Sequence, residues 1–240
     1  MFIYLYRVYE TLYQKSNYHD IIWFTNSSDY LLFYIQSNMT HREFNPQDHY
    51  NKAAKQREYV ARSIYKLQEI DDKYHLLHKK VTTVLDIWCS PWSWLQYVHQ
   101  KVGRNSWFIA LWIDIQPVKI SLNWVHTYVA DATDRDHCLS LITWLWITSF
   151  DCIISDLAPH TIWFKDIDAM RCIWVLEWTL WLYEQFLKPW WTFVMKIFMW
   201  PWFDEFVAQC KKNRWATNIK LVKPKACRDM SKEIYIVKWR

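Results

Sequence analysis

Short apolar runs alternate with segments of helical periodicity along most of the chain. The run VTTVLDI (residues 81–87) is apolar and compact, as expected of a buried strand, whereas LQYVHQKV (residues 95–102) spaces its apolar side chains three or four apart, as a helix does. The same two patterns recur towards the C-terminus. The predicted strands are 81–88, 107–114, 124–130, 150–157, 191–198, 218–223 and 233–238. The predicted helices are 57–73, 93–101, 134–141, 166–187 and 203–212.

This alternation predicts an α/β fold in which helices cover both faces of a mostly parallel sheet. The last two predicted strands are joined by a short connection, whereas a parallel crossover needs about a dozen residues or more. They are therefore expected to form an antiparallel hairpin at one edge. The predicted architecture is Rossmann-like, with a seven-stranded sheet.

The first part of the chain differs from the rest. Residues 1–38 are rich in Tyr and Phe and show neither clear periodicity nor helix caps. A polar, basic, helix-forming segment follows Met39. We expect Met39 to be the true start, with residues 1–38 an over-extended reading frame or a dispensable arm. Residues 39–240 contain no repeat or linker and are expected to form one domain.

Composition changes this picture at the turns. The chain has Gly 1 and Trp 19, whereas average usage would give about 7% glycine, or roughly 17 residues. Turns and helix ends need residues that tolerate positive φ, which glycine does best. Tryptophans stand at such places in LDIWCSPWSWLQ, LKPWWTF and FMWPWFDEF. Six of them are singled out as turn positions: Trp88, Trp92, Trp190, Trp191, Trp200 and Trp202.

We favour the hypothesis that a codon read as glycine in the source organism has been translated as tryptophan. Gly103 would then come from an ordinary glycine codon, and a few tryptophans, Trp94 among them, would be genuine. The alternative is a truly tryptophan-rich protein. Trp174, Trp178 and Trp181 lie at helical spacing and fit either core aromatics or misread glycines. The codons at Trp88, Trp92, Trp190 and Trp191 distinguish the two interpretations.

Cysteine, histidine and hydropathy patterns narrow the class of protein. The six cysteines form no C-x-x-C pair and follow no secretory signal, so we expect reduced thiols and a cytoplasmic location. His75 and His78 fit a solvated helix face, and no metal site is expected. The apolar run over residues 173–202 is interrupted by Glu177, Glu184 and Lys188, which argues against a membrane span.

Charge is uneven along the chain. The formal net charge is +5, but residues 211–240 carry ten Lys and Arg against Asp229 and Glu233. A basic end on a near-neutral body indicates an anionic partner, for which nucleic acid is the usual candidate. A merely solvated basic face is the alternative.

Acidic residues mark the ends of successive predicted strands. Asp86, Asp114 and Asp131 close the first three of them. In parallel sheets ligands bind beyond the carboxyl ends of the strands, and an acid at the second strand end can accept hydrogen bonds from a ribose. Three such acids favour a nucleoside-like cofactor, although each alone fits a strand-end cap equally well.

From about Asp48 onward the chain resembles the FtsJ-type RNA ribose 2′-O-methyltransferases, with most family glycines appearing as tryptophan. DHYNKAAKQREYVARSIYKLQEID is similar to the family's N-terminal helical segment, and DIWCSPWSWLQ to its cofactor loop. SDLAP at residues 155–159 is similar to the motif after the fourth strand, with Asp168 and Arg171 fitting the helix that follows. LKPWWTFVMKIFMWPWFDEF and KPKACRDMSKEIYIV resemble the family's Lys-Pro-Gly-Gly strand and closing hairpin.

The resemblance implies a class I methyltransferase that uses S-adenosylmethionine. It assigns a catalytic Lys–Asp–Lys–Glu set to Lys66, Asp156, Lys196 and Glu233. Lys196 would orient or deprotonate the ribose hydroxyl, with burial and Lys66 favouring its neutral form and Asp156 opposing this. The implied cofactor contacts are Asp86, Trp88, Pro91, Trp92, Trp94, Asp114, Asp131 and Asp156. Real indoles at Trp88 and Trp92 would occupy space that the cofactor needs.

The resemblance also implies a substrate, a uridine of bacterial large-subunit (23S) ribosomal RNA, free or within the large ribosomal subunit. A transfer-RNA 2′-O-methyltransferase is the alternative within the family, and a non-catalytic RNA-binding module is the alternative if the tryptophans are real. We expect a monomer with no membrane partner. The basic residues expected to contact RNA phosphates are Lys52, Lys55, Arg57, Arg62, Lys211, Lys212 and Arg214.

Overall fold

The computed structural model describes residues 49–88, 92–118, 122–157, 165–228 and 230–239. Contacts gather residues 45–240 into one compact unit. The strands are β1 (Thr83–Ile87), β2 (Ile109–Asp114), β3 (Val125–Val129), β4 (Phe150–Ser155), β5 (Leu187–Phe198), β6 (Ile219–Val222) and β7 (Glu233–Lys238). The helices are α2 (His49–Gln56), α3 (Ile64–Tyr74), α4 (Ser93–Val102), α5 (Arg135–Trp144), α6 (Lys165–Phe186) and α7 (Phe203–Lys212), followed by the short 3-10 helix η1 (Arg214–Ala216).

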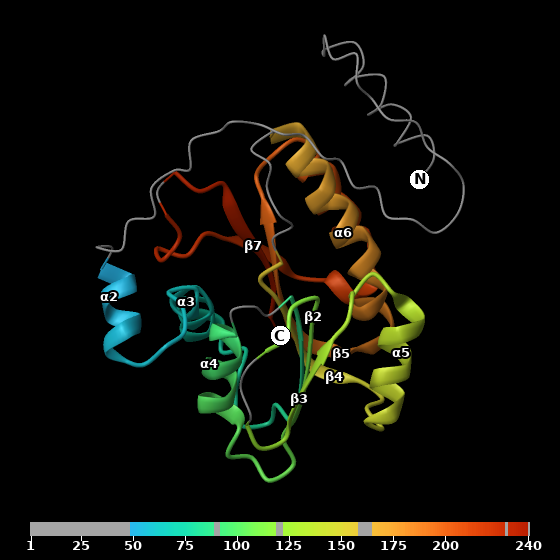
Figure 1. The fold of residues 1–240 in the computed structure, drawn as a ribbon. Coiled ribbons are helices and arrows are strands. Elements are labelled where there is room, and N and C mark those ends of the chain that lie inside the picture. The colour runs from blue at the N-terminus through green and yellow to red at the C-terminus, as the bar shows by residue number, and fades with distance from the viewer. Residues whose placement is uncertain (1–48, 89–91, 119–121, 158–164, 229, 240) are drawn as a thin grey trace. The chain divides into compact units, whose positions relative to one another are not determined.

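All seven strands join one sheet in the order β3-β2-β1-β4-β5-β7-β6 (Figure 1). The pairs among β1 to β5 are parallel, while β7 runs antiparallel to both β5 and β6. The predicted mostly parallel sheet with an antiparallel C-terminal edge hairpin is therefore confirmed. Because β1 and β4 lie side by side at its centre, their carboxyl ends meet at the place where ligands bind in such sheets.

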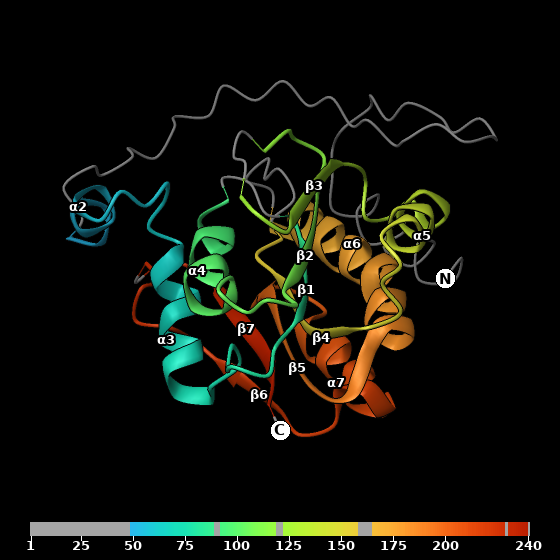
Figure 2. The same ribbon diagram turned by 90° about the horizontal axis from the view of Figure 1, so that it is seen from below.

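Helices cover both faces of the sheet. α3 and α4 pack on one face and α5, α6 and α7 on the other, as Figure 2 shows in the view from below. Alternate residues of each central strand serve the two cores: Leu85 and Ile87 face the α5–α7 side, and Val84 faces the α3–α4 side. None of the described helices is long and apolar enough to cross a membrane.

Two element boundaries differ most from the prediction. The helix expected at residues 57–73 begins only at Ile64, after a turn in which Glu58 has a φ of 57°. The backbone N–H of Val60 there donates to Oε1 of Gln96 on α4 at 2.9 Å. This contact between distant segments replaces a helical bond, and local propensity cannot reveal it. β5 begins at Leu187, earlier than expected, with a register shift against β4 between Phe150 and Cys152.

Five tryptophans adopt the left-handed conformation that suits glycine. Their φ values are 65° at Trp88, 55° at Trp92, 62° at Trp124, 56° at Trp146 and 68° at Trp202. A side chain with a Cβ costs roughly 1–2 kcal/mol in this region. Trp92 and Trp202 are also the N-cap residues of α4 and α7 and make no side-chain capping bond there.

The remaining turn tryptophans do not share this conformation. Trp190 and Trp191 lie in β5, and Trp200 in the turn after it, without positive φ. The expectation that all six turn positions need positive φ is thus wrong for these three, because β5 extends back over the Lys-Pro-Trp-Trp segment. Exposure also points to glycine at Trp190, which is 82% exposed, and adds to the evidence at Trp146, which is 91% exposed. Together these features favour the glycine hypothesis.

Candidate active site

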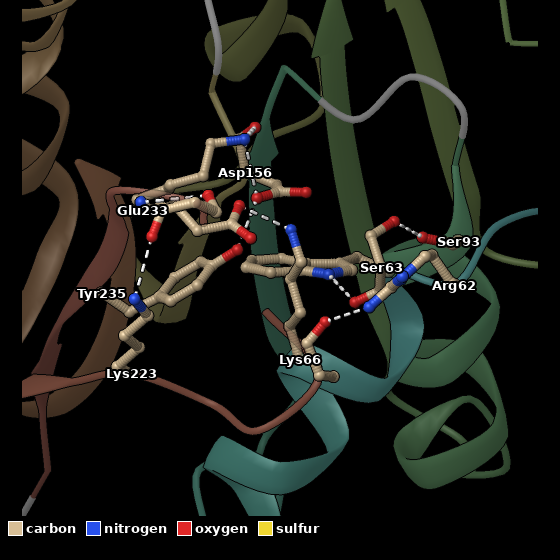
Figure 3. A network of polar contacts seen from close by, with 12 residues as sticks. Arg62, Ser63, Lys66, Ser93, Asp156, Lys223, Glu233 and Tyr235 are labelled. Atoms are coloured by element: carbon tan, nitrogen blue, oxygen red, sulfur yellow. Dashed lines mark hydrogen bonds and ion pairs between the residues drawn. The ribbon is translucent and has the colours of Figure 1, made fainter. Parts of the chain in front are cut away.

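Four charged residues from separate segments meet at the carboxyl end of the central strands (Figure 3). Lys66 comes from α3, and Asp156 follows β4 directly. Lys196 lies in β5 and Glu233 opens β7. The antiparallel register of β5 and β7 pairs Phe198 with Glu233, which brings the start of β7 to the end of β5. We call Lys66, Asp156, Lys196 and Glu233 the tetrad.

The tetrad forms two short ion pairs. Nζ of Lys66 lies 2.7 Å from Oε2 of Glu233, and Nζ of Lys196 lies 2.9 Å from Oδ1 of Asp156. Lys196 also donates to the backbone oxygen of Asp156 at 2.5 Å. The side chains of Lys196 and Glu233 are only 6% and 9% exposed. The geometry therefore holds both ammonium groups in fixed positions away from bulk water.

Opposite charges favour the charged forms of Asp156 and Lys66 despite their burial. Burial alone would raise the pKa of Asp156, but Lys196 and Lys66 together hold that pKa below its usual value. Burial alone would lower the pKa of Lys66, but Asp156 and then Glu233 raise it. Both shifts have the direction expected of opposite charges a few ångströms apart.

Tyr235 also contacts the tetrad, and the sequence analysis did not predict it. Its hydroxyl donates to Oδ1 of Asp156 at 2.8 Å, and its ring lies 5.8 Å from that of Trp94. Burial, with Asp156 next in weight, raises the pKa of Tyr235 well above its usual value. The available signal was strand alternation, because Tyr235 stands two residues after Glu233 and so shares its face of β7.

Trp94 connects the cofactor loop to the helix that carries Lys66. Its indole N–H donates to the backbone oxygen of Ser63 at 2.9 Å, and the hydroxyls of Ser63 and Ser93 lie 2.6 Å apart. The side chain is almost fully enclosed, at 2% exposure. This packing role differs from the cofactor contact that the resemblance implied, since almost no indole surface is left for a ligand.

The three strand-end acids lie where a nucleoside would be held. Asp114 closes β2, and its backbone oxygen accepts from the N–H of Ala130, which joins the ends of β2 and β3 at 2.9 Å. Oδ1 of Asp131 accepts from the backbone and the hydroxyl of Thr133 at 2.8 and 2.7 Å. Asp86 is fully buried, and its Oδ2 accepts from the indole N–H of Trp112 at 2.6 Å. Burial raises the pKa of Asp86 well above its usual range.

The acids fit a nucleoside cofactor, but the tryptophans around them do not. Trp88 and Trp92 flank the loop after β1 in left-handed conformation, where backbone rather than side chain must approach a ligand. The Trp112 indole donates to Oδ2 of Asp86, a residue that the resemblance assigns to the cofactor. Glycine at Trp88 and Trp92 would open the same edge. Pro91 lies outside the described residues.

Asp168 and Arg171 lie near the start of α6. Asp168 is 2% exposed, and Arg171 is half-buried.

The basic residues predicted to contact RNA fall into two separated groups. Lys52, Lys55 and Arg57 are exposed on and just after α2. Arg62 instead donates to the backbone oxygen of Ala226 at 2.6 Å and lies over the Tyr50 ring. The other group, Lys211, Lys212 and Arg214, leads into β6, whose first residue, Ile219, pairs with Lys238.

That pairing places the second group far from the tetrad. Lys238 ends β7 and Glu233 begins it, so Ile219 lies at the opposite end of the sheet from Glu233. The predicted C-terminal RNA contacts, Lys211, Lys212 and Arg214, are therefore at the end of the sheet away from the tetrad. The reason is that β6 and β7 form an antiparallel hairpin, which returns the chain to the tetrad only at residues 223–232.

Known proteins match this chain over most of its length. Residues 59–240 match the family model described as FtsJ-like methyltransferase. A ribosomal RNA large subunit methyltransferase E of Desulforapulum autotrophicum is 37% identical over 190 residues, which cover 79% of this chain and 90% of that protein. The protein of the same name from Bdellovibrio bacteriovorus is 34% identical over 194 residues, covering 81% of this chain and 96% of the relative.

Solved structures share the fold. A Plasmodium falciparum protein described as a ribosomal RNA methyltransferase superposes with a TM-score of 0.63 at 24% identity, covering 75% of this chain and 96% of that one. Human Methyltransferase-like protein 13, in complex with SAH, gives a TM-score of 0.50 at 15% identity, covering 69% of this chain and 75% of that one. At these identities the likeness concerns the fold.

Proposed function

We propose a reaction from the premise that this chain belongs to the FtsJ-like methyltransferase family. The protein transfers a methyl group from S-adenosylmethionine to a ribose 2′-hydroxyl of RNA. Its substrate is a uridine of bacterial large-subunit (23S) ribosomal RNA. The curated relatives named ribosomal RNA large subunit methyltransferase E support this choice over transfer RNA.

One observation carries the proposal: the buried pair of ion pairs at the carboxyl ends of β4 and β5. A ribose hydroxyl is a poor nucleophile and must lose its proton as the new bond to carbon forms. Lys196 and Lys66, fixed by Asp156 and Glu233, offer two positioned ammonium groups next to the strand-end acids. Purely structural ion pairs would have no reason to gather at the ligand-binding edge of the sheet.

The methyl donor, when bound, supplies a carbon activated by a positively charged sulfur. The chain supplies positioning. Nζ of Lys196 is the candidate to orient the 2′-hydroxyl as an ammonium group or, as a neutral amine, to accept its proton, and Asp156 holds that Nζ in place. Tyr235 fixes the Asp156 carboxylate in turn. Glu233 holds Lys66, whose charge helps to keep Asp156 ionised. Such fixed geometry contributes by aligning the hydroxyl with the methyl group.

A second candidate function follows from the tryptophans. A chain that truly carries indoles at Trp88 and Trp92, in their left-handed conformation, would have its cofactor edge blocked. It would then act as an RNA-binding module without catalysis. For either function we propose a cytoplasmic monomer, in keeping with an RNA substrate.

The test compares two proteins. One is the chain with all its tryptophans. The other is the glycine-restored protein, in which glycine replaces eight tryptophans: Trp88, Trp92, Trp124, Trp146, Trp190, Trp191, Trp200 and Trp202. Each is incubated with methyl-labelled S-adenosylmethionine and with 23S RNA, large ribosomal subunits or transfer RNA, and the product is digested to nucleosides. We expect 2′-O-methyluridine from large-subunit RNA with the glycine-restored protein. A label found only on bases, or only in transfer RNA, would contradict the proposal.

A further inference from the structure

The segment between β6 and β7 presents a row of positive charges at the tetrad end of the sheet. This segment, residues 223–232, reads KPKACRDMSK and is called the basic strap; its one acidic residue, Asp229, lies outside the described residues. Its four cationic side chains, Lys223, Lys225, Arg228 and Lys232, are exposed, while Pro224, Ala226 and Cys227 between them are buried. The buried residues fix the segment to the protein, and the cationic side chains between them are exposed to solvent.

The strap is tied to the helix that carries Lys66. Oε2 and Oε1 of Glu69 on α3 accept the backbone N–H groups of Lys225 and Ala226 at 2.6 and 2.9 Å. Nη2 of Arg62, just before α3, donates to the backbone oxygen of Ala226 at 2.6 Å. Because Arg62 and Glu69 flank Lys66 on the same stretch of chain, the strap and Lys66 are held in one frame.

Its C-terminal part is tied to the tetrad as well. Nζ of Lys223 donates to the backbone oxygen of Ser231 at 2.8 Å, closing the strap on itself (Figure 3). The backbone N–H of Met199, directly after β5, donates to the oxygen of Lys232 at 2.8 Å. Lys232 therefore lies beside the end of the strand that carries Lys196 and immediately precedes Glu233.

Two cations at the strap lie close enough to repel each other. After burial, the charge of Arg228 is the next cause that lowers the pKa of Arg62. An anion placed beside this pair would relieve the repulsion. A phosphate group is suited to it, because guanidinium groups bind phosphate oxygens with two parallel hydrogen bonds.

We propose that the basic strap is a pre-ordered clamp for the RNA backbone next to the target ribose. This deepens the proposed function and rests on it for the identity of the RNA. Lys225, Arg228 and Lys232 contact phosphates, while Arg62 and Glu69 are positioning residues that hold the strap. An ordered strap loses little conformational freedom on binding, so its contacts favour binding more than those of a flexible tail would.

The chain offers a matched control for the test. The test variant carries Lys225→Gln, Arg228→Gln and Lys232→Gln. The control variant carries Lys211→Gln, Lys212→Gln and Arg214→Gln, which removes the same charges from the opposite end of the sheet. Binding to a large-subunit RNA transcript is measured over a salt series without S-adenosylmethionine, so the result does not depend on catalysis. Melting temperatures of both variants confirm that they fold.

For the test variant we expect the slope of log K against log salt to flatten by about 2–3 units, or roughly 0.7–0.9 per phosphate contact. The control should keep the parent's slope. With an active protein, KM for RNA should rise while kcat stays close to that of the parent. Equal flattening in both variants, or an unchanged slope in the test variant, would overturn the proposal. If the proposed function itself is wrong, the result is different: the parent protein binds the RNA but transfers no methyl group to it.

Discussion

Around β4, β5 and β7 the site is made of paired side chains, whereas around β1 it also depends on the backbone of the loop that follows the strand. On the first side, Lys66, Asp156, Lys196 and Glu233 are paired at 2.7 and 2.9 Å, and Tyr235 completes the set at 2.8 Å. On the second side, the loop after β1 is flanked by residues with φ of 65° and 55°. Chemistry carried by side chains survives the exchange of glycine for tryptophan, whereas a site where ligand must touch backbone does not.

The largest expected effect is on the free energy of unfolding, when the left-handed tryptophans are replaced. Five left-handed tryptophans at roughly 1–2 kcal/mol each together cost a sizeable part of a net stability of about 5–15 kcal/mol. Replacing Trp88, Trp92, Trp124, Trp146 and Trp202 by glycine should therefore raise the free energy of unfolding by about 5 kcal/mol or more. Chemical denaturation measures it.

Trp94 and Trp215 provide the control. Both are buried, at 2% and 8% exposure, and neither has positive φ. Glycine at either position should destabilise the protein by about 3–5 kcal/mol, as expected for loss of a large core side chain. If all seven substitutions lower the free energy of unfolding alike, the left-handed tryptophans do not differ from the buried ones. That result would contradict the comparison between the two sides of the site.

A substitution within the tetrad should impair catalysis without impairing cofactor binding. In the glycine-restored protein, Lys196→Ala should lower methyl transfer by about 100-fold or more, the contribution typical of a positioned proton-transfer group, and leave S-adenosylmethionine affinity nearly unchanged. Single-turnover rates and a cofactor titration measure the two quantities. The exposed Lys79→Ala serves as a control and should match the parent. Turnover within a few-fold of the parent would remove Lys196 from the mechanism.

The ion pairs should respond to the loss of one partner. Glu233→Gln leaves the ammonium of Lys66, 12% exposed, without its closest carboxylate. Breaking a buried pair in this way costs about 3–5 kcal/mol. The free energy of unfolding should fall by that amount, and the matched surface variant Glu205→Gln should change it little. A fall no larger than that of Glu205→Gln would show that the pair adds nothing to stability.

Carboxylates on the two sides should give opposite pH dependence. The pKa of Asp156 is lowered by Lys196 and Lys66 despite burial. Its contribution to stability is present above the ordinary carboxyl pKa and is lost as pH falls through the lower folded value. Burial raises the pKa of Asp86, so stability falls as pH rises from about 4 towards that raised value, by about 1.4 kcal/mol per pKa unit.

Melting temperatures from pH 3 to 8 test this contrast. Asp156→Asn should lie below the parent at pH 7 and approach it as pH falls below about 4. Asp86→Asn should match the parent near pH 4 and exceed it increasingly towards pH 8. Two differences of the same sign at pH 8 would contradict the electrostatic part of the comparison.

Much of this could be predicted from the sequence, for reasons that differ between elements. The runs 81–88 and 150–157 are apolar and buried on both faces, so β1 and β4 follow from local pattern alone. The break before Ile64 depends on a bond between Val60 and Gln96, which no local pattern encodes. The count of charges along the sequence placed Lys211 and the basic strap in one basic region. The antiparallel pairing of β6 and β7, which separates them in space, is visible only in the sheet. Tyr235 was overlooked because tyrosine in a strand is ordinary.

The central claim is that tryptophan stands at glycine positions of an S-adenosylmethionine site. Calorimetric titration of S-adenosylmethionine into the full tryptophan chain and into the glycine-restored protein tests it most directly. We expect saturable one-to-one binding to the glycine-restored protein and no detectable heat with the tryptophan chain, both proteins being folded by circular dichroism. Equal affinity in the two proteins would contradict the claim and make the tryptophans native.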